Sequence, residues 1–288
     1  MASMRDIKRR KESIQSTEQI TKAMKLVSTV KLQKSRTKAE TTKPYFDMMY
    51  QTIRAMLEKS GGIQHPYLTP GENGKKAVIA ITSNRGLAGG YNANIIRLIM
   101  GSGMTPDETT IYAVGRKGRD GLARKGYEIG GDYSDVINDP LYSDAVEITR
   151  TLLDAFQKGE VSEIYLAYTS FKNTVVHVPK LIKLLPVTLE EREQETKAAG
   201  PAAPMNYEPN EEEALNAIIP KYIGSMVYGA MMEAVASENG ARMNAMDNAT
   251  SNAEEMIAGL SLQYNRARQG AITQELTEII AGANAIEG

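Results

Sequence analysis

The stretch that decides the fold is residues 210–286, NEEEALNAIIPKYIGSMVYGAMMEAVASENGARMNAMDNATSNAEEMIAGLSLQYNRARQGAITQELTEIIAGANAI. Asn210 is a good N-cap residue, and Glu213 three positions later completes a capping box, so a helix is predicted to start here. Most of the residues form helices readily, and no proline follows Pro220, where a kink is expected. About 65 further residues would reach roughly 100 Å. A helix this long cannot be buried in its own domain, so it is predicted to pack on another long helix or to enter a partner.

One face of this helix is suited to pairing with another helix. Its apolar residues are spaced mostly three and four apart, and most are alanine, so two backbones can approach closely. The predicted seam comprises Ala241, Ala245, Ala249, Ala253, Met256, Leu260, Ala267 and Ala271. The C-terminal end carries larger apolar residues at a place where most chains are polar and frayed. This apolar end comprises Ile272, Leu276, Ile279, Ala283 and Ile286.

Composition narrows the classes of function. The chain has 288 residues, a net charge of −1 and no cysteine. The absence of cysteine excludes disulfides, thiolate metal sites and thiol catalysis, and the near-neutral charge gives no overall attraction to nucleic acid. No apolar run approaches the roughly 18 residues of a membrane span. No signal peptide is expected at the basic, polar start of the chain.

Residues 2–59 are predicted to form a second long helix, bent at Pro44 and ended by Gly61-Gly62. Residues 1–40 hold eleven Lys or Arg against four Asp or Glu. This basic face indicates either a solvated helix surface or a docking face for an acidic partner or nucleic acid. The predicted apolar stripe of the helix comprises Met4, Ile7, Ile14, Ile20, Met24, Val27 and Val30.

The middle of the chain has the pattern of an α/β domain. AVIAIT (77–82) is a short β-branched run typical of a buried strand, and a glycine turn leads from it into a predicted helix at 92–100. Strand, turn and helix form the first half of a βαβ unit, so a mainly parallel sheet is predicted. The other predicted elements are a strand at 109–114, a helix ending at 124, strands at 127–129 and 161–168, a helix at 143–158, and a hairpin or pair of extended segments at 173–187. The residues predicted to face inward from the helix at 143–158 are Val146, Leu152, Leu153 and Phe156.

Motifs for catalysis or cofactor binding are weak. The glycine turn Gly86-Leu87-Ala88-Gly89-Gly90 matches neither GxxxxGK[ST] nor GxGxxG, so a tight backbone turn is favoured over nucleotide binding. The two histidines are His65 in a predicted loop and His177 in a predicted strand, and they indicate neither a metal site nor a catalytic triad. We therefore predict no catalytic residue, no cofactor and no metal site.

These elements predict an α/β fold class, with a long antiparallel coiled coil of the N- and C-terminal helices plus a small, mainly parallel, Rossmann-like domain. If the two helices start level at the domain, the last one overhangs by roughly 20 residues, from near Arg266. The apolar end would then lie beyond the coiled coil, which marks a binding element. The predicted divisions are an N-terminal shaft helix (1–60), a central domain (75–190), a linker or foot (191–210) and a C-terminal shaft helix (211–288).

Four segments resemble one known family. They are ITKAMKLV (20–27), SNRGLAGGYN (83–92), ARMNAMDNATSNA (241–253) and YNRARQGAITQELTEI (264–279). Together they resemble the gamma subunit of the F-type ATP synthase, bacterial type, and the resemblance covers the whole length. The chain lacks the cysteine-bearing regulatory insert of the plant chloroplast type.

This resemblance implies a function and a set of partners. The chain would be a non-catalytic central-stalk rotor subunit, present in one copy per complex. It would transmit torque between the membrane c ring and the catalytic alpha3beta3 hexamer, and so couple proton transport to ATP synthesis or hydrolysis. The implied partners are the alpha, beta and epsilon subunits and the c ring, with no nucleic acid. Contact with the membrane would come only through the complex, at the cytoplasmic face of the bacterial cell membrane.

The resemblance also implies which residues contact partners. For Met24, an ordinary position in the helix seam is an equal alternative. The positions that match contacts with the mobile lobes of the beta subunits or with the collar of the hexamer are Lys22, Met24, Arg268, Gln269 and Thr273. The residues implied to seat in the hexamer sleeve are Ile272, Leu276 and Ile279, and those aligned with the foot near the c ring are Tyr207 and Glu208.

Two other classes of function stay open from the sequence. A small-molecule enzyme built on the α/β domain would bind a nucleotide tightly through residues 75–190. A nucleic-acid-binding coiled coil would use the basic N-terminal face, and its binding would fall steeply with added salt. Neither class accounts for the apolar overhang.

Overall fold

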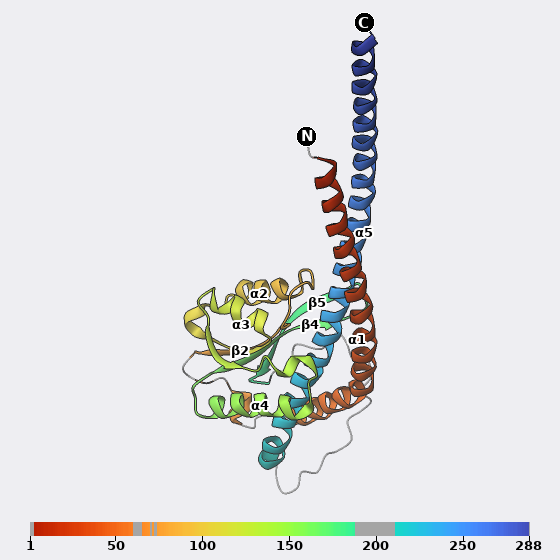
Figure 1. The fold of residues 1–288 in the computed structure, drawn as a ribbon. Coiled ribbons are helices and arrows are strands. Elements are labelled where there is room, and N and C mark those ends of the chain that lie inside the picture. Colours follow the sequence, from red (N-terminus) through yellow and green to blue (C-terminus); the bar gives the residue numbers. More distant parts are fainter. Residues whose placement is uncertain (1–2, 60–64, 70, 72–73, 188–210, 288) are drawn as a thin grey trace. The chain divides into compact units, whose positions relative to one another are not determined.

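A computed structural model of the chain (Figure 1) describes residues 3–59, 65–69, 71, 74–187 and 211–287. The chain divides into two compact units. One, the α/β unit, is Thr29–Arg242, and the other, the helix-pair unit, combines Met1–Ser28 with Met243–Gly288.

Two long helices contribute residues to both units. They are α1 (Met4–Lys59) and α5 (Glu211–Glu287), and each contains an internal proline, Pro44 and Pro220 respectively. The two predicted long helices are therefore present. The expected helix stop at 61–62, the expected cap at position 210 and the linker at 191–210 lie outside the described residues.

The α/β unit is built around one sheet of five strands in the order β3-β2-β1-β4-β5. β1 pairs in parallel with β2 and β4, β2 pairs in parallel with β3, and β5 runs antiparallel to β4. The predicted, mainly parallel sheet is confirmed. The strands are β1 (Lys76–Ile81), β2 (Thr109–Val114), β3 (Glu128–Asp132), β4 (Glu163–Phe171) and β5 (His177–Leu185).

The hairpin predicted within residues 173–187 is wrong. That stretch holds the single strand β5, which forms a hairpin with β4. The reversal comes earlier, because the Asn173 side chain accepts hydrogen bonds from the backbone N–H groups of Val175 and Val176 at 2.9 and 2.8 Å. Such a side-chain turn closes the hairpin before β5 begins.

Helices cover both faces of this sheet (Figure 1). Successive residues of β1 point to opposite faces, so Val78 and Ala80 pack in one core with α2 and α3. Ile79 and Ile81 pack in the other core with α4 and with parts of α1 and α5. The shorter helices are α2 (Tyr91–Gly101), α3 (Arg116–Ala123) and α4 (Tyr142–Gln157), and the 3-10 turns are η1 (Pro66–Leu68), η2 (Pro106–Glu108) and η3 (Val136–Asn138).

One residue of the predicted inward face of α4 points elsewhere. Leu152, Leu153 and Phe156 are buried as expected, but Val146 is 42% exposed, so its inward placement was wrong. Val146 lies at the flank of the buried face, opposite Gly224 of α5, where an added Cβ would lie 3.6 Å from Val146 Cγ2. Because glycine has no side chain, it leaves the valine partly uncovered.

In the helix-pair unit, the two helix ends run antiparallel. Lys22 of α1 pairs with Glu254 at 2.9 Å, whereas Lys25 pairs with Asp247 at 2.6 Å, so numbers rise on one helix as they fall on the other. The predicted antiparallel pairing is confirmed within this unit.

The seam of α5 differs from the predicted line of alanines. Met256 is 48% exposed and lies outside the seam. The predicted alanines recur every four residues, a spacing that drifts around a helix of 3.6 residues per turn, whereas a seam alternates three and four. The buried and half-buried line that does alternate comprises Met246, Thr250, Ala253, Ile257, Leu260, Tyr264 and Ala267.

The seam of α1 is also shifted from the prediction. Ile20, Val27 and Val30 are 57%, 57% and 70% exposed, so their seam placement was wrong. Polar residues take the inner positions instead: Thr21 and Ser28 are both buried. Ile7 is buried and Met4, Ile14 and Met24 are half-buried, so the predicted stripe is right for these four residues and wrong for the other three.

The C-terminal end of α5 is exposed throughout. Every described side chain from residue 268 to residue 284 is exposed. Ile272, Leu276 and Ile279 are 48%, 54% and 62% exposed, and Ile280 adds a further apolar side chain. The expected unpartnered apolar end is therefore present in the helix-pair unit.

Candidate functional sites along α5

The first candidate site is the surface of the α/β unit against which α5 packs, here called the seat of α5. It is formed by the contacts of Glu233, Ala234, Ser237 and Arg242 with the sheet and its loops. After β1, the chain adds β2 and β3 on one side of the sheet and then β4 and β5 on the other side. The strand order therefore reverses between β1 and β4, next to the carboxyl ends of these two strands. Open α/β sheets usually bind their ligands at such a point. Here α5 occupies it, because Ser237 donates a hydrogen bond to the carbonyl of Thr169 in β4 at 3.1 Å.

Two further contacts hold α5 in this seat. The backbone N–H of Phe171, the last residue of β4, donates to a carboxylate oxygen of Glu233 at 3.1 Å. The Tyr91 hydroxyl, at the start of α2, donates to the carbonyl of Ala234 at 3.2 Å. Burial raises the pKa of Tyr91 well above its ordinary value, and nearby Glu238 raises it further, so the hydroxyl keeps its proton and remains a donor.

The last turn of α5 in this unit is tied to the glycine turn. The guanidinium of Arg242 pairs with Glu238 at 2.6 Å, and both side chains are largely buried. A second nitrogen of Arg242 donates to the carbonyl of Gly86 at 3.3 Å. Because a guanidinium offers several donors in one plane, a single arginine joins the helix to the loop.

Hydrogen bonds order the loops that follow β1 and β2. The N–H of Ser83 donates to Asn92 Oδ1 at 2.9 Å, and the N–H of Lys117 donates to the carbonyl of Ser83 at 3.0 Å. At the start of α3, the N–H of Gly118 donates to Thr82 Oγ1 at 2.8 Å. In the glycine turn itself, Leu87 and Gly89 have positive φ angles of 64° and 55°, and the N–H of Tyr91 donates to the carbonyl of Ala88 at 3.2 Å. This geometry favours the interpretation of the turn as a tight backbone connection.

A close approach explains one glycine of the second turn. Gly115 has a φ of 126°, and an added Cβ would lie 2.2 Å from the carbonyl oxygen of Thr82. No other residue fits there without moving the backbone. The motif GRKG (115–118) therefore serves the packing of two adjacent loops.

His177 packs directly against α5. An added Cβ at Gly240 would lie 2.6 Å from His177 Nε2. Burial lowers the pKa of His177, so the imidazole is neutral at pH 7. His65 is also buried, and its Nδ1 accepts a hydrogen bond from the N–H of Tyr67 at 3.2 Å. Within the described residues, no group of three or more His, Asp or Glu side chains is placed to hold a metal ion.

The second candidate site is the surface of the helix-pair unit, where most predicted contact residues lie. Lys22 is half-exposed, and its hydrogen bond to Glu18, followed by that to Glu254, raises its pKa. Met24 is half-buried beside the seam. Lys22 and Lys25 thus already have acidic partners on the helix pair, which leaves less of the basic face for nucleic acid.

The other predicted contact residues divide into two groups. Arg268, Gln269 and Thr273 are exposed on the end of α5, and the Thr273 hydroxyl donates to the carbonyl of Gln269 at 2.9 Å. The structure brings these three close to the apolar end on one stretch of helix. Tyr207 and Glu208 lie outside the described residues.

Sequence reasoning missed the seat of α5. Its polar contacts come from Glu233, Ser237 and Arg242. The available signal was the presence of charged and hydroxyl side chains inside a run of Met, Ala and Val that is otherwise suited to a core. Such residues in an apolar stretch need partners, and the carboxyl ends of the strands supply them.

The fold and these surfaces define a class of protein. One unit is an α/β domain whose ligand edge is filled by a long helix of its own chain, and the other unit is an antiparallel helix pair with an exposed apolar end. The family model described as ATP synthase matches residues 3–286. An ATP synthase gamma chain of Lachnoclostridium phytofermentans is 67% identical over 99% of this chain and 100% of its own length. The chain belongs to the gamma-subunit family of the F-type ATP synthases.

More distant relatives and solved structures agree with this assignment. The gamma chain of Acetobacterium woodii named as sodium ion specific is 42% identical over 99% of both chains. A chain of the Tetrahymena thermophila mitochondrial ATP synthase central stalk and c-ring structure is 25% identical, with a TM-score of 0.58 over 80% of this chain and 99% of that one. A chain of the Euglena gracilis mitochondrial ATP synthase has a TM-score of 0.71 at 20% identity, over 98% of this chain and 94% of that one, which shows the shared fold. Among the described residues, none of the helices combines the length and apolar character that a membrane crossing needs.

Proposed function

We propose that this chain is the central-stalk rotor subunit that carries torque between the membrane c ring and the catalytic alpha3beta3 hexamer of its ATP synthase. The observation that carries the proposal is that α5 is one helix from Glu211 to Glu287, packed into the α/β unit at its start and fully exposed at its end. A rotor needs one part that cannot slip and one part that meets its surroundings. The polar contacts of Glu233, Ser237 and Arg242 supply the first part.

The exposed end of α5 is proposed to enter the hexamer. Ile272, Leu276 and Ile279 would seat in an apolar sleeve, and burying four or five Ile or Leu side chains contributes roughly 5–10 kcal/mol of gross hydrophobic energy. Arg268, Gln269 and Thr273 would contact the collar or the mobile lobes of the beta subunits. The helix-pair surface at Lys22 and Met24 would do the same, although Met24 also borders the seam.

The remaining parts of the proposal concern the partners and the location. The chain is proposed to be non-catalytic, to be present once per complex and to contact the epsilon subunit as well as the alpha and beta subunits. Tyr207 and Glu208 are proposed to form the foot near the c ring. The functional divisions are proposed as shaft segments 1–60 and 211–288, a central domain 75–190 and a linker 191–210. The complex is proposed to lie at the cytoplasmic face of a bacterial membrane.

Reconstitution with purified alpha and beta subunits tests this proposal. The full chain is expected to form one large complex and to activate ATP turnover, and the isolated chain is expected to hydrolyse no ATP. A chain truncated after Arg266 is expected to assemble less tightly and to activate turnover less, because it lacks the apolar end. Complex size and ATP turnover are the measurements.

A matched pair of substitutions keeps the test specific to the apolar end. Leu276→Ser removes an exposed apolar side chain, whereas Gln274→Ser changes a polar one on the same turn. Only the first is expected to weaken assembly. A full chain that neither joins nor activates the hexamer would contradict the proposed function, and ATP turnover by the pure chain would contradict its non-catalytic role.

A further inference from the structure

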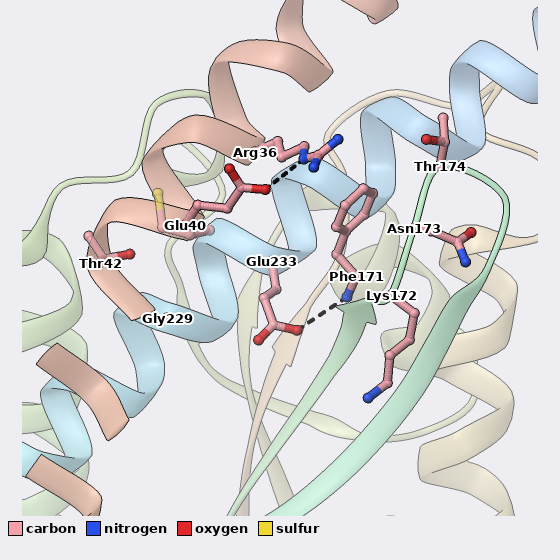
Figure 2. Close-up of a pocket in the computed structure, with 10 residues that line it drawn as sticks. Arg36, Glu40, Thr42, Phe171, Lys172, Asn173, Thr174, Gly229 and Glu233 are labelled. Carbon is pink, nitrogen blue, oxygen red and sulfur yellow. Dashed lines mark hydrogen bonds and ion pairs between the residues drawn. The ribbon is translucent and has the colours of Figure 1, made fainter. Parts of the chain in front are cut away.

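A pocket of about 290 Å³ opens in the α/β unit between α1, α5 and the turn that joins β4 to β5 (Figure 2). Its charged lining residues are two cations and two carboxylates: Arg36, Lys172, Glu40 and Glu233. Arg36 and Glu40 form an ion pair at 2.7 Å, and Glu233 accepts a hydrogen bond from a backbone N–H of β4 at 3.1 Å. The charges of the lining balance in number, so they favour no class of ligand.

A histidine packs against α5 where the turn from β4 ends. His177 is the first residue of β5, and its Nε2 would lie 2.6 Å from a Cβ added at Gly240, so the imidazole takes up space that glycine leaves open. The imidazole also lies against the ring of Phe171, with the two ring centroids 5.9 Å apart. The α/β unit ends at Arg242, two residues after Gly240. His177 therefore contacts the last stretch of α5 in this unit.

The packed arrangement is suited to a neutral imidazole. The Nε2 atom of His177 is buried and has no hydrogen-bond partner among the described residues. A neutral imidazole has one nitrogen without a proton, whereas the protonated ring has two donors and a charge. A buried charge without a partner is costly, so burial lowers the pKa of His177. The geometry of this contact thus selects the neutral form.

Charged side chains of α5 and of the β4–β5 turn also lie in this region. Glu238 and Arg242 of α5 form an ion pair at 2.6 Å, and both are largely buried. Glu233 accepts a backbone N–H of β4, and Lys172 of the turn has an interaction of its own within the chain. Neither carboxylate accepts a hydrogen bond from His177 Nε2. A proton on this nitrogen therefore has no acceptor unless the imidazole moves away from α5.

We propose that His177 is a pH-sensitive contact: its neutral imidazole holds residues 237–240 of α5 against β4 and β5, and its protonation releases them. Ser237 belongs to the released stretch, since its hydroxyl donates to the carbonyl of Thr169 in β4 at 3.1 Å. The contacts of Glu233 and Ala234 lie about one turn earlier and keep α5 attached.

In the complex, this release would loosen α5 where it leaves the α/β unit and so reduce the transmission of torque in acid. This consequence rests on the proposed function, because it requires a rotor that works against the hexamer. The contact itself is a property of the isolated chain.

Labelling of a single thiol in the full chain tests the contact. The chain has no cysteine, so Ser237→Cys introduces one thiol at a position that is 0% exposed. Its rate of reaction with a methanethiosulfonate reagent is divided by that of Ser251→Cys, an exposed position on α5, at the same pH. This ratio removes the pH dependence of the thiol itself and reports local opening. Between pH 6.5 and pH 5.5 the ratio is expected to rise by about threefold or more, with a limit of about tenfold for one proton.

Variants of the two histidines assign the rise to one residue. His177→Phe, added to Ser237→Cys, keeps a ring beside Phe171 without a titratable nitrogen, and its ratio is expected to be equal at both pH values. His177→Gln serves the same comparison if phenylalanine itself opens the contact. His65→Gln removes the other histidine and is expected to keep the rise. Circular dichroism at both pH values checks that the chains are folded. No rise with Ser237→Cys alone, or the same rise in the folded His177 variants, would overturn the proposal.

ATP turnover of the reconstituted complex tests the role of this contact. Turnover is measured at pH 7.5 and pH 5.5 with the unchanged chain and with His177→Phe, because the catalytic subunits respond to pH equally in both complexes. The complex with the unchanged chain is expected to lose about twofold more activity in acid. Equal losses would overturn the role in the complex. A chain that joins the hexamer at neither pH would instead contradict the proposed function, and the thiol result would still decide on the contact itself.

Discussion

Two parts of the same helix, α5, show how differently one helix can be used. In the α/β unit its side chains are buried on nearly every turn, as Ile219, Ile223, Val227 and Met231 show with 0–1% exposure. In the helix-pair unit only a narrow seam is covered, and from residue 268 onward every described side chain is exposed. The difference teaches that one continuous helix can be held by packing in one part and remain available to a partner in the other.

The largest expected effect comes from equal truncations in the two parts. Ile223→Ala should lower the free energy of unfolding by about 2–5 kcal/mol, because it leaves a cavity in a core. Ile279→Ala, at a 62% exposed position, should change it by less than about 0.5 kcal/mol. Urea unfolding followed by circular dichroism measures both. Equal effects would show that the end of α5 is packed in the isolated chain, and would contradict the difference in packing between the two parts of α5.

Two glycines on α5, one in each unit, give a second comparison between its packed and its exposed part. At Gly240 an added Cβ would meet His177 Nε2 at 2.6 Å, whereas at Gly259 nothing lies within 4 Å. Gly259→Ala should stabilise the chain by about 1 kcal/mol through helix propensity. Gly240→Ala gains the same propensity but must displace a packed imidazole, so a net loss of about 1 kcal/mol is expected. The unfolding temperatures of the two variants test this expectation. Stabilisation by both substitutions would show that His177 moves freely.

Acidification should weaken the seat of α5 through His177. Burial lowers the pKa of this imidazole below its ordinary value. As the pH falls through about 6.5, the unfolded chain takes up a proton that the folded chain does not, so the free energy of unfolding decreases until the pH reaches the folded pKa. His177→Gln lacks this group. Urea unfolding at pH 7.5 and pH 5.5 should therefore show a larger loss for the unchanged chain, and equal losses would contradict the role of His177.

The smallest effect is expected from the ion pairs of the helix pair. Lys25 and Asp247 lie 2.6 Å apart, but their side chains are 40% and 55% exposed. A double-mutant cycle with Lys25→Ala and Asp247→Ala should give a coupling energy of about 0.2–1 kcal/mol, and added salt should reduce it. A coupling above about 2 kcal/mol would mean that polar contacts, and not the narrow seam, hold this unit together.

Some features of the fold followed directly from local sequence. β2 is at Thr109–Val114, as predicted, because a β-branched run between turn residues has few other options. The predicted position of the hairpin was wrong because the chain reverses at Asn173, whose side chain accepts hydrogen bonds from the backbone of the turn. Val146 was misplaced because its exposure depends on Gly224, which lies on another helix.

The candidate sites show the same limit. The apolar end of α5 was predictable, since Ile272, Leu276 and Ile279 follow one face of a helix that extends beyond the helix it pairs with. The seam was not, because Thr21 and Thr250 share a buried hydrogen bond at 2.8 Å, and a pattern of apolar residues does not detect such a pair. The pocket around Glu233 was not predictable either, because α1, α5 and the β4–β5 turn meet there only in the folded chain.

By itself, the sequence determined the two long helices, the sheet and the apolar end, because helix propensity, proline placement and apolar period act between near neighbours in the chain. Only the tertiary structure decided that α5 fills the ligand edge of its own sheet and that Thr21 and Thr250 take inner positions in the helix seam. Those outcomes depend on which hydrogen-bond partner each buried polar group finds, and the partners are distant in sequence: Ser237 and Thr169, or Arg242 and Gly86.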